Sequence, residues 1–211
     1  MKIEIWSDVA CPWCYLGKRH LEEALARRPG EEIEVAWRSF QLQPDAPRFG
    51  EPGAGAPTRE YLEARGYDRI EEMQARLTQM AAAAGLAYRL DLGRHANTFE
   101  AHALIKAAAR QGLGEAMVER LFKAQHVEGL RLDDPEVLAA LAAEVGLAGA
   151  AATPTEADRE AAREEIAEAR AIGVDGVPFF VFDRRLAVSG AQPAEVLLAA
   201  MEQAAQADAP A

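Results

Sequence analysis

The sequence predicts an α/β fold in which a long helical segment interrupts a small sheet. A strand-helix-strand pattern occupies residues 1–42, and a strand-strand-helix pattern follows residue 173. Between them, apolar residues recur at intervals of three and four, which is typical of amphipathic helices. We therefore assign residues 1–42 and 173–208 to a sheet domain, residues 58–172 to an all-helical insertion, and residues 43–57 to a linker.

The N-terminal unit begins with residues 2–6, where polar and apolar residues alternate as in a strand. From Leu16 the period changes to that of a helix, which is expected to run to about Arg28, before Pro29-Gly30. Residues 33–40 alternate again and predict a second strand. Two strands joined by a helix indicate a right-handed βαβ unit.

The linker holds four prolines and three glycines, which favour loop structure. In the helical segment, Asp68 with Glu71 and Asn97 with Glu100 have the spacing of capping boxes, and Asp134-Pro135 is typical of a helix start. Helices are expected at about 70–84, 97–112, 114–129, 135–146 and 155–172.

The C-terminal unit opens with residues 177–182, which are apolar throughout, as in a strand covered on both faces. Residues 183–185 predict a turn and residues 186–188 the paired strand of a hairpin. Pro193 is expected to start a last helix, and an Ala-rich tail follows from about Gln206.

Cys11-Pro12-Trp13-Cys14 lies where the first strand gives way to the first helix. Pro12 suits the first helical position, so Cys11 is expected to be the N-cap residue. A thiolate there can accept hydrogen bonds from the free N–H groups of Trp13 and Cys14, and it lies at the positive end of the helix dipole. We therefore predict that Cys11 is the catalytic nucleophile and that Cys14 resolves the mixed disulfide that forms on Cys11. An inert pair of buried cysteines is the alternative.

Several other functions are disfavoured by composition. A zinc site needs four ligands, and the two cysteines and four scattered histidines show no metal-ligand spacing, so no metal is expected. The formal net charge of -11 argues against nucleic acid or a membrane as partner. No apolar run is long enough for a membrane span, and no secretory signal pattern is seen, so we expect a cytoplasmic protein. Two cysteines in a reducing compartment seldom form a structural disulfide, which favours a catalytic role.

Five stretches together resemble one protein family, and they span almost the whole chain: residues 7–19 around the cysteines, 40–42 (Phe-Gln-Leu), 97–102, 173–180 with Gly-Val-Pro-Phe-Phe, and 189–192. In these the chain is similar to the FrnE-like dithiol oxidoreductases of the DsbA-like thioredoxin superfamily. The resemblance implies an α/β, thioredoxin-like fold (βαβ and ββα) split by the helical insertion. It also implies disulfide exchange with protein or peptide thiols, with no bound cofactor and with glutathione as a candidate redox partner.

The resemblance implies site residues beyond the cysteines. In thioredoxin-like folds the bond before the matching proline is cis and lies beside the cysteine pair. The resemblance therefore predicts a cis Val177–Pro178 bond beside Cys11 and Cys14, with the Val177 backbone free to pair with an extended substrate. A plain edge-strand proline is the alternative. Trp13, between the cysteines, is a further candidate substrate contact. Lys18 and Arg19 are expected on a solvated helix face.

Three polar residues are weaker candidates. Asp8, just before the cysteine pair, is expected to be either a proton acceptor or a turn residue. Asn97 and His102 belong to a stretch typical of the resemblance, and the insertion that holds them is expected to cover the cysteine site. Asn97 is explained equally well as a helix N-cap, and His102 as an ordinary helical residue.

Related enzymes supply the alternative function. Kappa-class glutathione transferases and 2-hydroxychromene-2-carboxylate isomerases look similar along the whole chain, but they carry serine where this chain has Cys11 and use glutathione on small molecules. The presence of both Cys11 and Cys14 favours disulfide exchange instead. These relatives also make a homodimer a candidate assembly, and a non-catalytic interaction protein is the third possibility.

Overall fold

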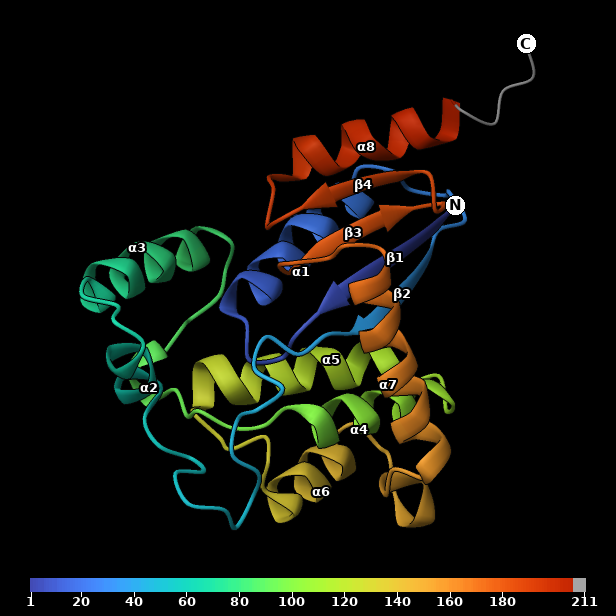
Figure 1. The fold of residues 1–211 in the computed structure, drawn as a ribbon. Coiled ribbons are helices and arrows are strands. Elements are labelled where there is room, and N and C mark those ends of the chain that lie inside the picture. Colours follow the sequence, from blue (N-terminus) through green and yellow to red (C-terminus); the bar gives the residue numbers. More distant parts are fainter. Residues whose placement is uncertain (207–211) are drawn as a thin grey trace.

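The computed structural model describes residues 1–206 as a four-stranded sheet with helices around it (Figure 1). The predicted end of the sheet domain at residue 208 and the Ala-rich tail beyond Gln206 lie outside the described residues. Within them, both the βαβ and the ββα units are present in the predicted order.

The sheet has the strand order β2-β1-β3-β4, with β1 (Lys2–Ser7), β2 (Glu34–Ser39), β3 (Phe179–Phe182) and β4 (Leu186–Ser189). β1 and β2 are parallel, as a helical crossover requires, and the other two pairings are antiparallel. β3 begins two residues later than predicted, so the Val177-Pro178 pair precedes the strand.

The helices are α1 (Pro12–Ala26), α2 (Thr58–Ala64), α3 (Ile70–Ala83), α4 (Phe99–Ala109), α5 (Gly114–Lys123), α6 (Pro135–Glu144), α7 (Glu156–Ala171) and α8 (Ala194–Gln206), with short helices at Leu90–Leu92, Ala124–Glu128 and Gly149–Ala152. The predicted capping boxes at Asp68 and Asn97 are wrong, because α3 begins after Arg69 and α4 after Thr98, both without a side-chain cap from that residue. A capping box forms instead at α7, where Thr155 and Asp158 hydrogen-bond reciprocally.

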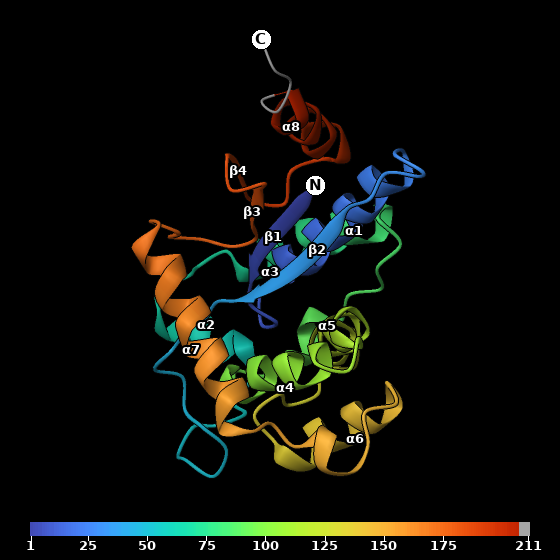
Figure 2. The ribbon, with the colours of Figure 1, turned by 90° about the vertical axis from the view of Figure 1, so that its right-hand side faces the viewer.

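Each face of the sheet packs against different helices. Alternate residues of β1 and β3 point to one face, where Ile3, Ile5 and Phe180 pack with α1 and α8. On the other face, Trp6 packs with Ala169 of α7. Figures 1 and 2 show α8 beside β4 and the group of α4, α5 and α6 beyond β2, at the opposite end of the sheet.

The start of α1 joins the sheet to this helical group. Cys11, Cys14, Tyr15 and Leu16 belong to the same buried cluster as the apolar side chains of α4, α5 and α6. The cysteine pair therefore lies where the two parts of the chain meet.

A buried ionic cluster ties α7 to the sheet. The carboxylate of Glu165 pairs with Arg38 at 2.9 Å, contacts the ammonium group of Lys106, and accepts the backbone N–H of Ser39 at 2.8 Å. Burial favours the neutral acid, but Lys106 and Arg38 outweigh it, so the pKa of Glu165 is lowered. Loss of this carboxylate would leave Lys106 buried without its partner.

Candidate active site

Cys11 caps the N-terminus of α1, as predicted, and Pro12 occupies the first helical position. The expected hydrogen bonds from the helix N–H groups to its side chain are not formed. Instead the Cys11 thiol points toward the C-terminal ββα unit, where its Sγ donates to the carbonyl oxygen of Val177 at 3.6 Å. Cys11 thus contacts the segment that precedes β3.

Cys14 lies one turn into α1 and is fully buried, and both cysteines are free thiols. Burial raises the pKa of the Cys14 thiol well above its usual value, and the neighbouring Cys11 acts in the same direction. The Ser7 side chain and the Asp8 backbone act in the opposite direction and do not offset burial. Cys14 is therefore protected from bulk solvent, whereas Cys11 lines a cleft.

The Val177–Pro178 peptide bond is cis, and the Pro178 ring is buried against α1. This approach depends on Gly17, since a Cβ at that position would lie 2.9 Å from Pro178 Cγ and 3.3 Å from Phe180 Cζ. A glycine on the inner face of α1 thus allows the helix that carries the cysteines to approach the proline segment closely.

Two buried polar side chains fasten the start of α1 and the loop before it. The Tyr88 hydroxyl donates to the Pro12 carbonyl at 2.6 Å, and His126 Nε2 lies 3.0 Å from the Val9 carbonyl. Burial lowers the pKa of His126 to about 4, so the ring is neutral at pH 7 and its Nε2–H is the donor. These bonds position the cysteine loop from the helical insertion.

Asp8 is buried, and its carboxylate accepts hydrogen bonds from the backbone around the cysteine loop. Its carboxylate accepts the N–H of Ala10 at 3.2 Å and the N–H of Leu42 at 2.8 Å, and His102 Nε2 lies 3.4 Å from it. The structure thus brings Asp8 and His102 together behind the cysteine loop. His102 is 2% exposed and therefore is not a surface residue of α4.

Asn97 does not reach the cysteines. Its amide nitrogen donates to the carbonyls of Pro44 and Ala46, and its oxygen accepts the Phe99 N–H at 3.0 Å and the Gln41 side-chain amide at 3.2 Å. The side chain therefore holds the linker against the start of α4.

An apolar cleft of about 290 Å³ opens beside Cys11, and we call it the cysteine cleft. The cleft is lined by residues of segments 10–13, 42–43, 90–96 and 125–126, by residues of α2 and α3, and by Tyr67 between these two helices. Four of the large apolar side chains that are exposed in the described chain lie in its wall: Trp13, Leu42, Tyr67 and Met73. Exposed apolar surface gathered at one place is typical of a binding site.

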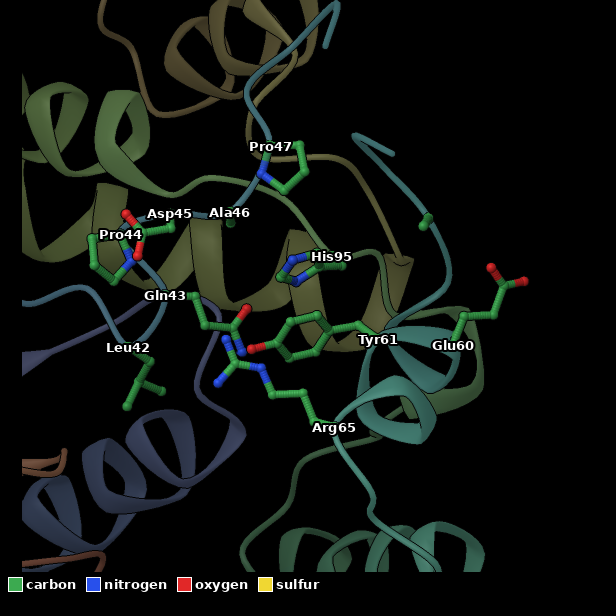
Figure 3. A pocket seen from close by; sticks show the side chains of 11 residues that line it. Leu42, Gln43, Pro44, Asp45, Ala46, Pro47, Glu60, Tyr61, Arg65 and His95 are labelled. Carbon is green, nitrogen blue, oxygen red and sulfur yellow. The ribbon is translucent and has the colours of Figure 1, made fainter. Parts of the chain in front are cut away.

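A second cleft of about 590 Å³ adjoins it, between the linker and α2 (Figure 3). We call it the linker cleft, and it shares Leu42, Gln43, Tyr61 and His95 with the cysteine cleft. His95 stacks on Tyr61 with ring centroids 3.8 Å apart. The two clefts therefore meet at one aromatic wall.

Among residues 1–206, no group of three or more His, Cys, Asp or Glu side chains is arranged to hold a metal ion. In the same part of the chain, no helix is both long and apolar enough to cross a membrane.

The chain is similar to known proteins in sequence and in fold. Residues 2–202 match the model of the DSBA-like thioredoxin domain. The structure is similar to a Streptomyces coelicolor protein described as a probable DsbA oxidoreductase, with a TM-score of 0.88 and 36% identity, over 100% of this chain and 92% of that one. Bacillus subtilis YwbO, described as uncharacterized, is 30% identical over 149 residues, which are 70% of this chain and 68% of that protein. A 2-hydroxychromene-2-carboxylate isomerase has the same fold, with a TM-score of 0.72 and 19% identity over 99% of this chain and 98% of that one.

The chain therefore belongs to the DSBA-like thioredoxin domain family, and the predicted thioredoxin-like fold with a helical insertion is confirmed. Its class is that of the DsbA-like thiol–disulfide oxidoreductases, with the Cys11–Cys14 pair at the start of a helix.

Long-range contacts that local sequence patterns do not predict involve Gly17, Tyr88, His126 and Lys18. Gly17 stands in the cysteine motif, but only the fold reveals what it approaches. His126 is one of the four scattered histidines, and its contact with the cysteine loop comes from a helix far along the chain. Lys18, expected in solvent, is 3% exposed because Glu115 and Glu119 of α5 pair with it at 2.7 and 3.0 Å.

Proposed function

We propose that this protein exchanges disulfides with protein or peptide thiols through Cys11, in the manner of the FrnE-like branch of its family. The observation that carries the proposal is the place of the Cys11 thiol: it lines an apolar cleft and lies 3.6 Å from the Val177 carbonyl, next to the cis Pro178. An extended substrate that pairs with the Val177 backbone would present its sulfur to Cys11.

The proposed reaction has two exchanges. The Cys11 thiolate attacks a sulfur of the substrate disulfide, which forms a mixed disulfide on Cys11 and releases the other substrate sulfur as a thiolate. The Cys14 thiolate then attacks the Cys11 sulfur, forms the Cys11–Cys14 disulfide and releases the second substrate thiolate. Two electrons pass from the protein to the substrate, and the reverse sequence oxidises a dithiol. Two glutathione molecules can restore the thiols by the same chemistry and leave as glutathione disulfide.

Supporting roles follow from the contacts of the other residues. Trp13, exposed at the rim of the cysteine cleft, is proposed to contact the side chains of the substrate. Asp8, with His102 beside it, is proposed to orient the backbone that lies against Cys14 rather than to touch substrate. We further propose a reducing compartment such as the cytoplasm, where free thiols persist.

Trapping the mixed disulfide tests this proposal. A Cys14→Ser variant incubated with a peptide disulfide is expected to accumulate one peptide adduct on Cys11, detected by intact mass, whereas the wild-type protein releases the peptide. Cys11→Ser is the matched control and is expected to form no adduct. If Cys14→Ser accumulates no adduct, or if both variants form the adduct equally, Cys11 is not the nucleophile that Cys14 resolves.

Glutathione-dependent chemistry on a small molecule is the competing function. In that case glutathione binding would not depend on a sulfur at position 11. A calorimetric titration of Cys11→Ser with glutathione is expected to show no tight stoichiometric binding. Tight binding that survives the substitution would favour an isomerase or transferase.

A further inference from the structure

The linker cleft contains an arginine without an acidic partner. Arg65 follows α2, is exposed, and its guanidinium lies over the Tyr61 ring, 5.1 Å from the centroid. Most arginines of this acidic chain pair with carboxylates, but among the described residues Arg65 forms no ion pair. A guanidinium offers five fixed donors that match a carboxylate.

Further donors point to the same place. Figure 3 shows the Gln43 amide and the Tyr61 hydroxyl directed toward the part of the cleft where the Arg65 guanidinium lies. Asp45 and Glu60 also line the cleft, but their carboxylates are directed elsewhere in this view. Amide, hydroxyl and guanidinium donors that converge in this way suit an anionic oxygen group.

The aromatic wall connects this group to the reactive sulfur. Tyr61 and Gln43 line both clefts, and the cysteine cleft contains Cys11. Burial and the charge of Arg65 both lower the pKa of His95, so its ring is neutral at pH 7 and offers a flat surface beside Tyr61. A peptide chain attached at Cys11 can therefore extend along this wall to Arg65.

We propose that the linker cleft binds a side-chain carboxylate of the peptide substrate. Peptides that carry an acidic residue at one fixed separation from the reacting cysteine are then the preferred substrates. This inference rests on the proposed disulfide exchange and adds a substrate class to it.

The net charge of the chain alone would favour basic peptides over acidic ones. At -11 the protein repels acidic peptides overall, so general electrostatics favours Lys over Gln and Gln over Glu at every position. A local site at Arg65 instead favours Glu over Gln at one position only. The two effects can therefore be separated by scanning the acidic residue along the peptide.

The experiment uses single-cysteine peptides in which that cysteine is joined to nitrothiobenzoate as a mixed disulfide. Attack of Cys11 on the peptide sulfur releases the coloured nitrothiobenzoate thiolate, so absorbance gives a second-order rate constant. Glu, Gln or Lys is placed in turn at each position that flanks the cysteine. We expect Glu to react about threefold faster than Gln at one position, which is the size of an exposed ion pair, and the preference should fall as salt is added.

Two variants test whether Arg65 causes the preference for Glu. Arg65→Gln is expected to abolish it, whereas Arg76→Gln is expected to retain it, since Arg76 is an equally exposed arginine that lines neither cleft and forms no ion pair among the described residues. Arg65→Lys should restore part of it. A faster reaction of Gln than Glu at every position, or a Glu preference that survives Arg65→Gln, would overturn the inference while leaving disulfide exchange intact. If none of the peptides reacts, the proposed function fails and this inference fails with it.

Discussion

Gly17 offers a quantitative test of how α1 is positioned. Alanine forms helices better than glycine by about 1 kcal/mol, so Gly17→Ala would stabilise an unobstructed helix. Here the new Cβ would lie 2.9 Å from Pro178 Cγ and 3.3 Å from Phe180 Cζ, and Phe180 is fully buried. Overpacking of this kind costs about 1–3 kcal/mol. With an overpacking cost of about 2 kcal/mol, the middle of this range, Gly17→Ala is predicted to lower the free energy of unfolding by about 1 kcal/mol.

Urea unfolding followed by circular dichroism measures this change with both cysteines kept reduced. Gly176→Ala is the control, because a Cβ at Gly176 would meet no atom within 4 Å, and it is expected not to destabilise the protein. A Gly17→Ala protein that unfolds at the same or a higher urea concentration than wild type would refute the close approach of α1 to Pro178.

Three further predictions concern buried ionisable groups. The pKa of His126 is lowered to about 4 in the folded protein, so between about pH 4 and 6.5 the unfolded chain binds more protons than the folded one. The neutral ring therefore contributes about 3 kcal/mol to the free energy of unfolding above pH 6.5, and this contribution is lost as the pH falls toward 4. Urea unfolding of His126→Gln should show a correspondingly smaller loss over that window. Glu165→Ala leaves a buried ammonium group unpaired and should lower the free energy of unfolding by about 3 kcal/mol, whereas Glu164→Ala, on the exposed face of the same helix, should stay within about 0.5 kcal/mol of wild type. Because burial raises the pKa of Cys14, stopped-flow release of a peptide from Cys11 should accelerate about tenfold per pH unit below that pKa, and a rate independent of pH would contradict this role.

Local pattern was enough to predict the sheet. The alternation in residues 2–6 and 33–40 corresponds to β1 and β2, since the side chains of a strand alternate between its two faces. The apolar run at 177–182 contains β3, which is covered on both faces of the sheet. The cysteine position followed in the same way, because Pro12 favours the first turn of a helix. The cis bond before Pro178 agrees with what the family resemblance implied.

Side-chain environments that depend on long-range packing could not be predicted from the sequence. Lys18 belongs to a helix face that looks solvated until α5 is placed against it. The Cys11 thiol turns away from the helix N–H groups because the Val177 carbonyl, far along the chain, lies within reach. Both clefts combine the linker with α2 and distant loops, and no local period encodes how these meet. Side-chain contacts between distant segments are therefore the part that required a structure.

Cys11 and Cys14 are proposed to form a reversible redox pair. Equilibration of the protein across glutathione redox buffers, followed by alkylation of free thiols and intact mass, measures how the two cysteines partition. We expect a single transition in which both thiols are lost together, with a midpoint between about -270 and -120 mV, the range spanned by thioredoxin and DsbA. Thiols that never pair, or a reaction that stops at one stable glutathione adduct, would show that Cys11 and Cys14 are not a redox pair.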